Sequence, residues 1–404
     1  MIRSGSLGAI NGPAGTMKRI IKNRFFFLER GYDISIYTHD SIKNGKVNYV
    51  PPSANAMKPR PWYKRILTDI SAVVRRWART NTLFANFYLK RSDRDMLKLI
   101  KYYISLNRKP DIIVFHSSME AGLYLQLCSK PARMVTFLHS DGTHTMTLSN
   151  FPCIKGKWGE HHLEELHNLA INQTDKIVFI SRIARDKFIS NNPDYPKVKI
   201  GLAVNGIEDF TDEEKENVSK VVSRFADFKY KLCCSGTVNG RKGQWMVINA
   251  IAALNDTKRK NFHFSILGDG SQRTELQQMV KDKHLEKNVS FEGKVKNELI
   301  YKYLAENNIY ILMSENEGLP ISIVEAMRSS LAVISTNVAG IPETVDKNGL
   351  LLDVSQQQLE KVFVHMDEYN WEEMGRLSRE KFEKEFSFNR MRTDYCDIMD
   401  SLFK

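Results

Sequence analysis

The sequence predicts an α/β protein made of two doubly wound domains in tandem. A chain of 404 residues is too long for one ordinary hydrophobic core and suits two α/β domains. Apolar, β-rich runs alternate with longer amphipathic stretches, which is typical of a parallel sheet with crossover helices. This rhythm occurs twice, on either side of a polar and charged stretch at 208–229 that has no strand signal.

The first half contains the expected elements of one such domain. A helix at 16–30 ends at Gly31, a residue that suits a helix C-terminus. Only Met1 and Ile2 precede a glycine-rich stretch at 3–8, so either the first strand is unusually short or the protein begins upstream of Met1. The predicted strands of this half are 33–37, 111–115, 134–138, 176–180 and 198–202.

The second half repeats the pattern with helical segments of ten or more residues between strands. We therefore expect an N-terminal domain at 1–207, a C-terminal domain at 208–385 and a terminal helix at 386–404. The predicted strands of this half are 230–234, 262–267, 289–291, 309–313 and 333–336.

Composition narrows the class of protein. With 42% apolar and 26% charged residues the chain is globular, and no apolar run approaches the ~18 residues of a membrane span. No signal peptide is recognisable at the start. The five cysteines are scattered and unpaired in spacing, which favours free thiols in a reducing compartment. The cytoplasm is the expected location.

The most informative stretch follows the predicted strand that ends at Met313. Glu317 lies in a turn, Pro320 begins a helix, and Glu325 lies about two helical turns later, roughly 10 to 12 Å from Glu317. Ligands of α/β domains gather at the carboxyl ends of strands. Two acceptors this far apart can hold two ends of an extended polyhydroxylated ligand, although ordinary surface carboxylates show the same spacing.

The flanking residues resemble a known signature. Residues 317–327 (EGLPISIVEAM) and 332–343 (AVISTNVAGIPE) resemble the family-four retaining glycosyltransferases of the GT-B fold. The resemblance implies two Rossmann-like domains facing across a cleft, with a C-terminal helix that crosses back to the N-terminal domain. It also implies that Glu317 binds the donor sugar and Glu325 the nucleotide ribose. The resemblance further implies that four residues line the sugar and diphosphate, namely Gly318, Leu319, Pro320 and Ile321.

A second segment, residues 236–243 (GTVNGRKG), resembles the turn that presents two cations to the diphosphate in that family. A leaving diphosphate gains negative charge as the glycosidic bond breaks, so fixed cations stabilise the transition state. Gly236, Arg241 and Lys242 are the candidates here, with Lys242 a catalytic one. Thr237 occupies the family's arginine position, and a solvated basic turn is the alternative.

Weaker resemblances add further candidates. His139, at the end of strand 134–138, resembles the family histidine that contacts the transferred sugar, whereas His116 and His284 are interpreted as structural or exposed. Gly15 lies in a turn of small residues (12–15, with Ala14 replacing a glycine) before the first helix. The remaining candidate contacts are Gly270 in a glycine-rich turn, Lys294 and Val295 at the nucleobase, and Asn205 at the domain junction.

No metal or cofactor is expected beside the nucleotide-sugar. Asp93-Arg94-Asp95 has the letters of a metal-binding Asp-x-Asp, but we interpret these as carboxylates at a helix start within a basic segment. The resemblance implies a metal-independent reaction, in which the phosphate itself takes the acceptor's proton.

Positive charge is concentrated in one segment. Residues 57–109 carry 14 lysines and arginines and 3 aspartates, which accounts for 11 of the 12 net positive charges. Residues 56–103 also contain many aromatic side chains, a mixture that suits anionic lipid headgroups. A solvated face whose aromatics belong to the core is the alternative. Nucleic acid ranks below both, because no recognition motif accompanies the charge.

The sequence thus predicts a hexosyltransferase. It would use a nucleotide-sugar, with UDP the expected nucleotide, and a lipid-linked or polymeric glycan acceptor in cell-surface polysaccharide biosynthesis, at the inner face of the membrane. A transferase with a soluble acceptor, of the sucrose or glycogen synthase type, is the second enzyme hypothesis. The other alternative is a catalytically silent nucleotide- or glycan-binding subunit, which Thr237 and the short first strand keep open.

Overall fold

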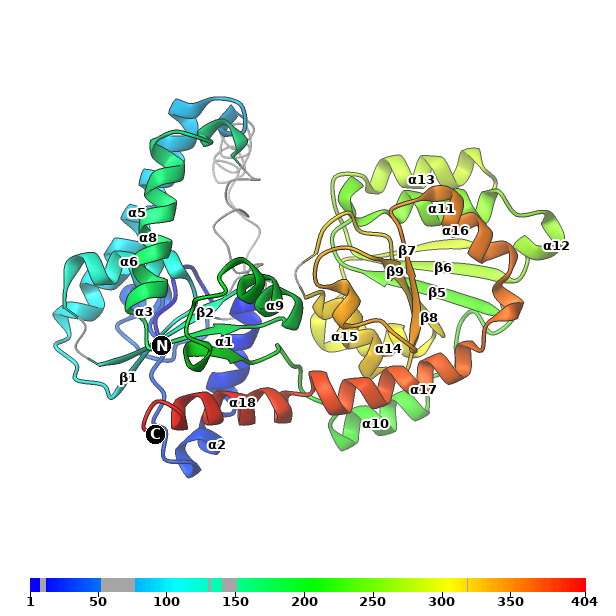
Figure 1. Ribbon diagram of the computed structural model, residues 1–404. Helices are drawn as coiled ribbons and strands as arrows, with labels where there is room; N and C mark the ends of the chain where they lie inside the picture. The colour runs from blue at the N-terminus through cyan, green and yellow to red at the C-terminus, as the bar shows by residue number, and fades with distance from the viewer. Residues whose placement is uncertain (8–11, 52–76, 130–131, 140–150, 318) are drawn as a thin grey trace. The chain divides into compact units, whose positions relative to one another are not determined.

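The computed structural model describes residues 1–7, 12–51, 77–129, 132–139, 151–317 and 319–404. The chain divides into two compact units. The first comprises Met1–Val204 together with Arg392–Lys404, and the second comprises Asn205–Met391. In each unit a parallel sheet carries helices, as the sequence predicts (Figure 1).

The sheet of the first unit has the strand order β1-β2-β3-β4, all parallel. Its strands are apolar runs whose side chains are mostly buried. Their bounds are Ile112–Phe115 (β1), Arg133–Leu138 (β2), Lys176–Phe179 (β3) and Ile200–Leu202 (β4). Ile2 forms parallel bridges with both Phe115 and Tyr37, so the first strand of this domain is reduced to a single bridging residue.

The predicted strand at 33–37 is wrong except for Tyr37. The Ile36 N–H donates to the side chain of Asn48 (2.7 Å), and the Asn48 amide donates to the carbonyl of Ile34 (3.3 Å). The side chain of Asn48, distant in the sequence, therefore takes the backbone groups that a strand ladder would use.

The predicted helix at 16–30 is divided. It forms α1 and α2, which are separated by Asn23, whose side chain donates to the Arg19 carbonyl (2.9 Å). The small residues at 12–15 are the first turn of α1 and not a turn before it, which corrects the expectation for Gly15. Gly31 has a left-handed φ of 85°, as its position after the helix predicts.

Most other helices of this unit begin at a polar N-cap, for example Asn81, Ser117 and Ser181. The helices are Gly12–Lys22 (α1), Arg24–Glu29 (α2), His39–Asn44 (α3), Thr82–Ser105 (α5), Ser118–Leu127 (α6), Trp158–Gln173 (α8) and Arg182–Asn191 (α9), with short 3₁₀ turns at Pro152–Ile154 and Lys197–Lys199.

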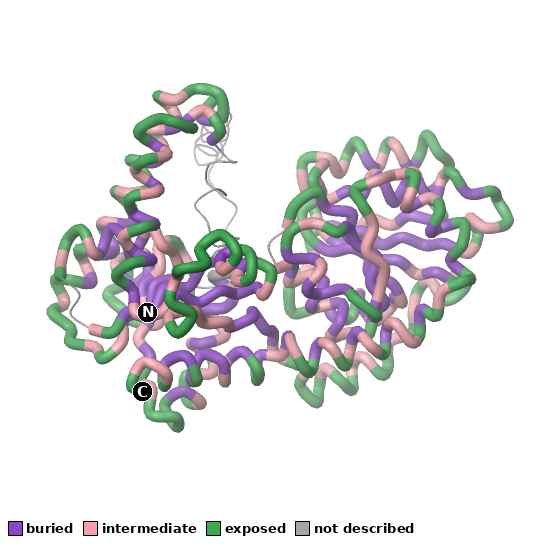
Figure 2. The backbone as a smooth tube through the Cα atoms, in the orientation of Figure 1, coloured by how far each residue is buried: buried purple, intermediate pink, exposed green. Residues whose placement is uncertain are grey.

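The chain's last helix, α18 (Phe388–Asp400), contributes its C-terminal part to the core of the first unit. Tyr395 stacks on Phe137 of β2, with ring centroids 4.6 Å apart and an interplanar angle of 24°. Both residues are buried, and Figure 2 shows that buried residues concentrate in the central strands of each unit. Through Tyr395, α18 thus packs against β2.

The second unit has a six-stranded parallel sheet in the order β10-β9-β8-β5-β6-β7. Five of its strands are predicted: Tyr230–Ser235 (β5), Phe262–Leu267 (β6), Val289–Gly293 (β7), Ile309–Leu312 (β8) and Ala332–Thr336 (β9). The sixth, Gly349–Leu352 (β10), is not. It is a short edge strand whose residues are all half-buried, so neither alternation nor a buried run marks it.

Helices cover both faces of this sheet, with α11, α13 and α16 along one and α14, α15 and α17 along the other (Figure 1). They are Asp212–Ser219 (α10), Gln244–Ala252 (α11), Asp256–Arg259 (α12), Arg273–Asp282 (α13), Ile300–Ala305 (α14), Ile321–Arg328 (α15), Gln356–Val364 (α16) and Trp371–Lys381 (α17). Short 3₁₀ turns lie at Gly240–Lys242, Asn297–Leu299, Ile341–Glu343 and Met366–Glu368, and a π-helical turn at Phe382–Phe386.

Candidate functional site

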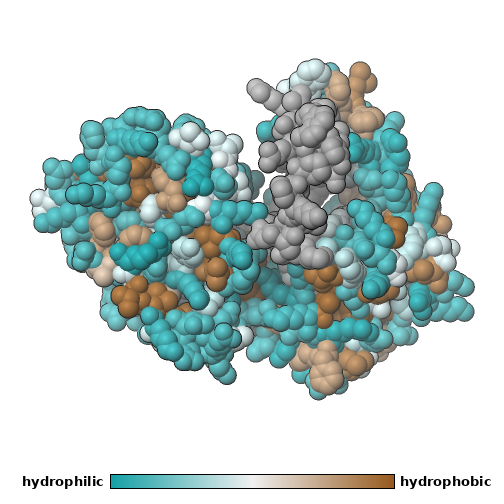
Figure 3. Space-filling view, turned by 180° about the vertical axis from the view of Figure 1, so that it is seen from behind, coloured by the Kyte–Doolittle hydropathy of each residue, from teal (hydrophilic) through white to brown (hydrophobic). Residues whose placement is uncertain are grey.

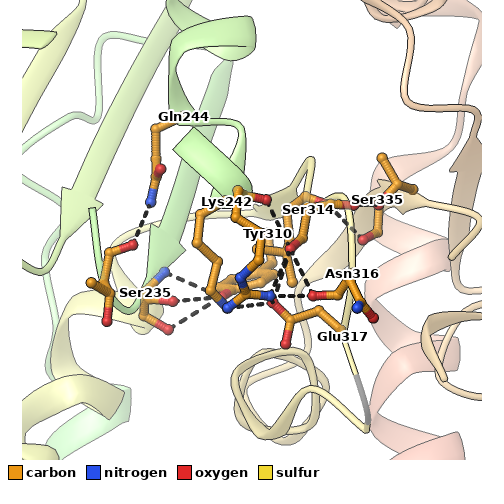
Figure 4. A network of polar contacts seen from close by, with 12 residues as sticks. Ser235, Lys242, Gln244, Tyr310, Ser314, Asn316, Glu317 and Ser335 are labelled. Carbon is orange, nitrogen blue, oxygen red and sulfur yellow. Dashed lines mark hydrogen bonds and ion pairs between the residues drawn. The ribbon is translucent and has the colours of Figure 1, made fainter. Parts of the chain in front are cut away.

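In the second unit, cationic and anionic side chains meet at the carboxyl ends of β5 and β8 (Figure 4). Lys242 Nζ lies 2.6 Å and Arg241 Nη1 3.0 Å from the same oxygen, Oε1 of Glu317. The Ser314 hydroxyl lies 2.9 Å from that oxygen. We call Arg241, Lys242, Ser314 and Glu317 the Glu317 cluster.

The backbone holds the two turns of this cluster together. β5 and β8 are neighbouring parallel strands, so the turns that follow them meet at one edge of the sheet. The carbonyl of Arg241 accepts from the Glu315 N–H (2.9 Å) and lies 3.0 Å from the Ser314 hydroxyl. Arg241 therefore contributes its backbone as well as its side chain to the position of Glu317.

Glycines allow the turns to approach closely. A Cβ on Gly243, which has a left-handed φ of 69°, would lie 2.1 Å from the carbonyl oxygen of Met313. A Cβ on Gly268 would lie 1.7 Å from that of Gly236, and one on Gly270 would lie 2.2 Å from that of Val238. The predicted glycine-rich turns after β5 and β6 thus pack backbone to backbone.

The members of the cluster differ in exposure. The side chains of Lys242 and Glu317 are 13% and 12% exposed, whereas that of Arg241 is 45% exposed. Two cations share one carboxylate, which leaves the cluster with one positive charge in excess. A partly desolvated cation interacts more strongly with an anion than a solvated one does, so Lys242 is the stronger candidate for binding one.

The other predicted residues of this unit lie at several positions. Pro320 is the N-cap of α15, Ile321 is its first residue, and Glu325 is half-buried on the same helix. Leu319 is half-buried, and Gly318 lies outside the described residues. Lys294 is exposed and Val295 half-buried directly after β7, and Asn205 is buried at the start of the unit.

In the first unit, two histidines lie at the carboxyl ends of neighbouring strands. His116 follows β1 and His139 follows β2, and Nδ1 of His116 lies 2.9 Å from Nε2 of His139. Phe137 stacks on the ring of His116, with centroids 4.8 Å apart and an angle of 17°. We call His116 and His139 the histidine pair.

The surroundings of the histidine pair keep both imidazoles neutral. Burial, and after it the positive charge of Arg3, lower the pKa of His139 to about 4. Burial, His139 and Arg3 together hold the pKa of His116 well below its ordinary value. Arg3 and Ser4 follow the bridging residue Ile2, and the Ser4 N–H donates to the buried carboxyl of Glu120 (2.5 Å).

Sequence reasoning identified His139 but did not link it to His116. The signal was present, because each histidine directly follows an apolar run that is a predicted strand. Ser314 was also missed as a member of the Glu317 cluster, although it is the first residue after the strand that leads to Glu317.

The interpretation of Asp93 and Asp95 as helix-start carboxylates is wrong. Both lie in the middle of α5, where Asp93 contacts Nε2 of His162 (2.8 Å) and Asp95 pairs with Lys98 (3.3 Å). Burial raises the pKa of Asp93, while the contact with His162 acts in the opposite direction. The helix begins earlier than expected because Asn81 caps it.

The two parallel-sheet units define the class of fold as GT-B. HepE of Anabaena, solved in complex with UDP, superimposes with a TM-score of 0.63 at 13% identity, covering 99% of each chain. Residues 215–364 match the family described as glycosyl transferases group 1. The matched segment contains the whole Glu317 cluster.

Curated relatives agree with this assignment. An uncharacterized glycosyltransferase of Methanocaldococcus jannaschii is 30% identical over 37% of this chain and 36% of its own length. An amylovoran biosynthesis glycosyltransferase of Erwinia amylovora is 23% identical over 83% of each chain. The chain spans between about a third and a half of the length of the first curated relatives it matches.

Proposed function

We propose that the protein is a retaining, metal-independent glycosyltransferase that moves a hexosyl unit from a UDP-sugar to a lipid-linked or polymeric glycan acceptor in cell-surface polysaccharide biosynthesis. The observation that carries the proposal is the Glu317 cluster, in which a carboxylate and two cations meet within 3.0 Å inside the segment that matches the family.

The chemistry of the cluster suits donor binding. Glu317 can accept hydrogen bonds from sugar hydroxyls. Lys242 and Arg241, which pair with Glu317 here, can also pair with the oxygens of a diphosphate. Cations that are already held in place stabilise the charge that develops on the leaving diphosphate. They supply the charge that a metal ion supplies in other transferases, so the proposal needs no cofactor beside the nucleotide-sugar.

UDP is proposed as the nucleotide on two grounds. Residues 236–243 resemble the family's diphosphate turn, and a solved neighbour of the same fold is a UDP complex. Glu325 on α15, together with Lys294 and Val295 after β7, would hold the ribose and the base. In the first unit, the resemblance assigns His139 to the transferred sugar and Gly15 to the phosphates.

A lipid-linked acceptor is supported by the first unit. Apolar side chains gather where α5 begins (Figure 3), among them Leu83 and Phe87, which are 80% and 54% exposed. Lys90, Arg91 and Arg94 follow on the same helix. Phe84 and Tyr88 instead pack on a buried cluster, as expected if the aromatic residues of this segment belong to the core. Residues 52–76 of this basic segment lie outside the described residues.

Location follows from the same surface. Among the described residues, no helix has the length and apolar content that crossing a bilayer requires. We propose that the protein works from the cytoplasm at the inner face of the membrane, with α5 in contact with anionic lipid. No nucleic acid partner is proposed.

The second candidate function is a silent nucleotide- or glycan-binding subunit. Thr237 favours this function, because the family that the sequence resembles has an arginine at this position. The backbone carbonyl of Thr237 accepts from the Gln244 side chain (3.2 Å), a contact that does not depend on the threonine side chain.

One experiment separates the two functions. The full chain is incubated with a panel of UDP-, GDP- and ADP-sugars, and release of nucleoside diphosphate and thermal stabilisation are both measured. The transferase predicts release with at least one donor and its loss in Glu317→Ala. Glu315→Ala is the matched control, because Glu315 is exposed in the same turn and outside the cluster.

Stabilisation by UDP without release from any donor would overturn the transferase and support the silent subunit. Release that persists in Glu317→Ala, or that Glu315→Ala removes equally, would overturn the role of the Glu317 cluster.

A further inference from the structure

The histidine pair has a property that neither residue has alone. One proton lies between Nδ1 of His116 and Nε2 of His139, which are 2.9 Å apart, because two neutral imidazoles form such a contact only if one donates and the other accepts. The tautomer of His139 is therefore tied to that of His116. If His116 donates, the proton of His139 is on Nδ1, and if His139 donates, its Nδ1 is a bare acceptor.

The outer nitrogens of the pair are the ones that the contact between the two rings leaves unused. His116 Nε2 and His139 Nδ1 are both buried and have no hydrogen-bond partner among the residues that the structure describes. Buried polar atoms are satisfied in most proteins, so each of these nitrogens can still take a partner that the described residues do not supply. Of the two, His139 is the less buried, and it is the residue proposed to face the transferred sugar.

We propose that His116 is a positioning residue, which fixes both the ring orientation and the tautomer of His139 through its Nδ1. This inference rests on the proposed function, because it assigns His139 to the transferred sugar. In this role His116 acts on His139 and not on the reacting atoms. It acts as the orienting group of a catalytic triad does, by holding the working imidazole in one protonation pattern.

Stacking makes His116 suitable for this role. Its ring lies on Phe137, and Phe137 lies on Tyr395 of α18 in turn, so three aromatic rings form one stack. Tyr395 and Phe137 are buried. A ring held on a buried stack has little freedom to turn, so the direction of its Nδ1 is preset before any ligand binds.

The charge near the pair supports the same role. Arg3, after Ile2, lowers the pKa of both histidines, and Glu120, in the first turn of α6, partly offsets the charge of Arg3. A protonated His116 could donate but not accept, which would remove one of the two tautomeric patterns. By opposing protonation, the surroundings keep the pair in the state in which tautomers are coupled.

Three substitutions separate positioning from packing. His116→Asn keeps a polar side-chain atom near the place of Nδ1, whereas His116→Gln places its amide near the position of Nε2. His116→Phe keeps the stack on Phe137 and removes the polar contact. A merely structural role predicts that the phenylalanine variant is the best tolerated of the three.

The kinetic test uses the full chain with the nucleotide-sugar that wild type hydrolyses or transfers. We expect His116→Gln and His116→Phe to lower kcat by about 10- to 100-fold, with the donor KM changed less than about 3-fold. His116→Asn should stay within about 5-fold of wild type. Thermal unfolding of each variant confirms that it is folded.

The spectroscopic test does not depend on turnover. The protein contains 10 histidines, so selective ¹⁵N-histidine labelling resolves them, and His139→Gln assigns the signal of interest. Wild type should show one neutral tautomer for His139, and His116→Phe a mixture of two. His116→Phe with wild-type kcat, or an unchanged His139 tautomer in that variant, would overturn the proposal. Absence of activity with every donor in wild type would instead sink the proposed function, and the tautomer measurement would still decide the role of His116.

Discussion

Lys242 and Glu317 lie 75 residues apart in the chain and form an ion pair of 2.6 Å, with both side chains mostly buried. Removing the cation from a mostly buried carboxylate lowers the free energy of unfolding, because the carboxylate keeps an uncompensated charge. The pair therefore links the turn after β5 to the turn after β8. A bound diphosphate would compete with Glu317 for Lys242, which couples donor binding to the position of the carboxylate.

Substitution of Lys242 should therefore affect turnover strongly. We expect Lys242→Ala to lower kcat by about 100-fold or more, because it removes a preorganised cation from the leaving diphosphate. Arg241→Ala should cost about 10-fold or less, since Arg241 is 45% exposed. Steady-state kinetics on both variants measure this, and a larger loss in Arg241→Ala would contradict the ranking.

Stability should fall in mild acid. Burial lowers the pKa of His139 and His263 to about 4, and that of His116 falls as well, whereas in the unfolded chain each binds a proton near its ordinary pKa of 6.5. The unfolded state binds more protons between these values, so the stabilisation is complete above pH 6.5 and is lost as the pH falls towards 4. For His139 and His263, a shift of this size corresponds to about 3 kcal/mol each.

Urea unfolding at pH 7.5, 6 and 5 measures this dependence. His263→Gln should flatten it, and His284→Gln is the control because His284 is exposed. Equal flattening by both substitutions would show that the assignment is wrong.

Tyr395 provides a different test of the first unit. Its hydroxyl is buried without a hydrogen-bond partner among the described residues, and burial raises its pKa. An unsatisfied buried hydroxyl is destabilising, so Tyr395→Phe should leave the free energy of unfolding unchanged or raise it by about 1 kcal/mol. Tyr395→Leu, which removes the stack on Phe137, should lower it. Denaturant unfolding distinguishes these results, and a Tyr395→Phe variant that is clearly less stable would reveal a partner for the hydroxyl.

The glycine turns predict that two glycine-to-alanine substitutions differ in their effect on the free energy of unfolding. Gly268→Ala places a Cβ 1.7 Å from the Gly236 carbonyl oxygen at a φ of 157° and should lower the free energy of unfolding by about 2–4 kcal/mol. Gly240→Ala is the matched control, because its Cβ would meet only the Gln272 amide at 3.6 Å. Comparable losses in the two variants, measured by thermal unfolding, would argue against close backbone packing at β6.

The apolar start of α5 predicts membrane attachment. Wild type should sediment with vesicles that contain anionic phospholipid, and Leu83→Ser with Phe87→Ser should reduce the bound fraction several-fold. Val222→Ser in the second unit is the control, because Val222 is 83% exposed. Binding that is insensitive to both the α5 substitutions and the lipid charge would contradict a lipid-contacting role.

Much of the second unit could be predicted because its signals are local. β6 is a run of six buried residues and ends in the glycines that its turn requires, so its bounds were predicted without error. β10 was not predicted, because an edge strand that is half-buried on both faces has no periodicity of its own. Its position depends on Gly349, whose missing Cβ lets the backbone approach the carbonyl of Val333.

The first unit shows the opposite balance. Ile2 forms a bridge on each side, and a single pairing residue leaves no pattern in a sequence. Asn48 ends the expected strand at Ile36 from twelve residues away, through a side-chain hydrogen bond that no propensity encodes.

By itself the sequence determined the α/β class, most of the strands, and Glu317, Lys242 and His139 as candidates, because each depends on a residue's own type and its near neighbours. Only the tertiary structure decided that Arg241 and Lys242 share one oxygen of Glu317, and that His116 is the partner of His139. Parallel strands bring distant turns to the same edge of a sheet, and which turns become neighbours depends on strand order, which a local pattern does not contain.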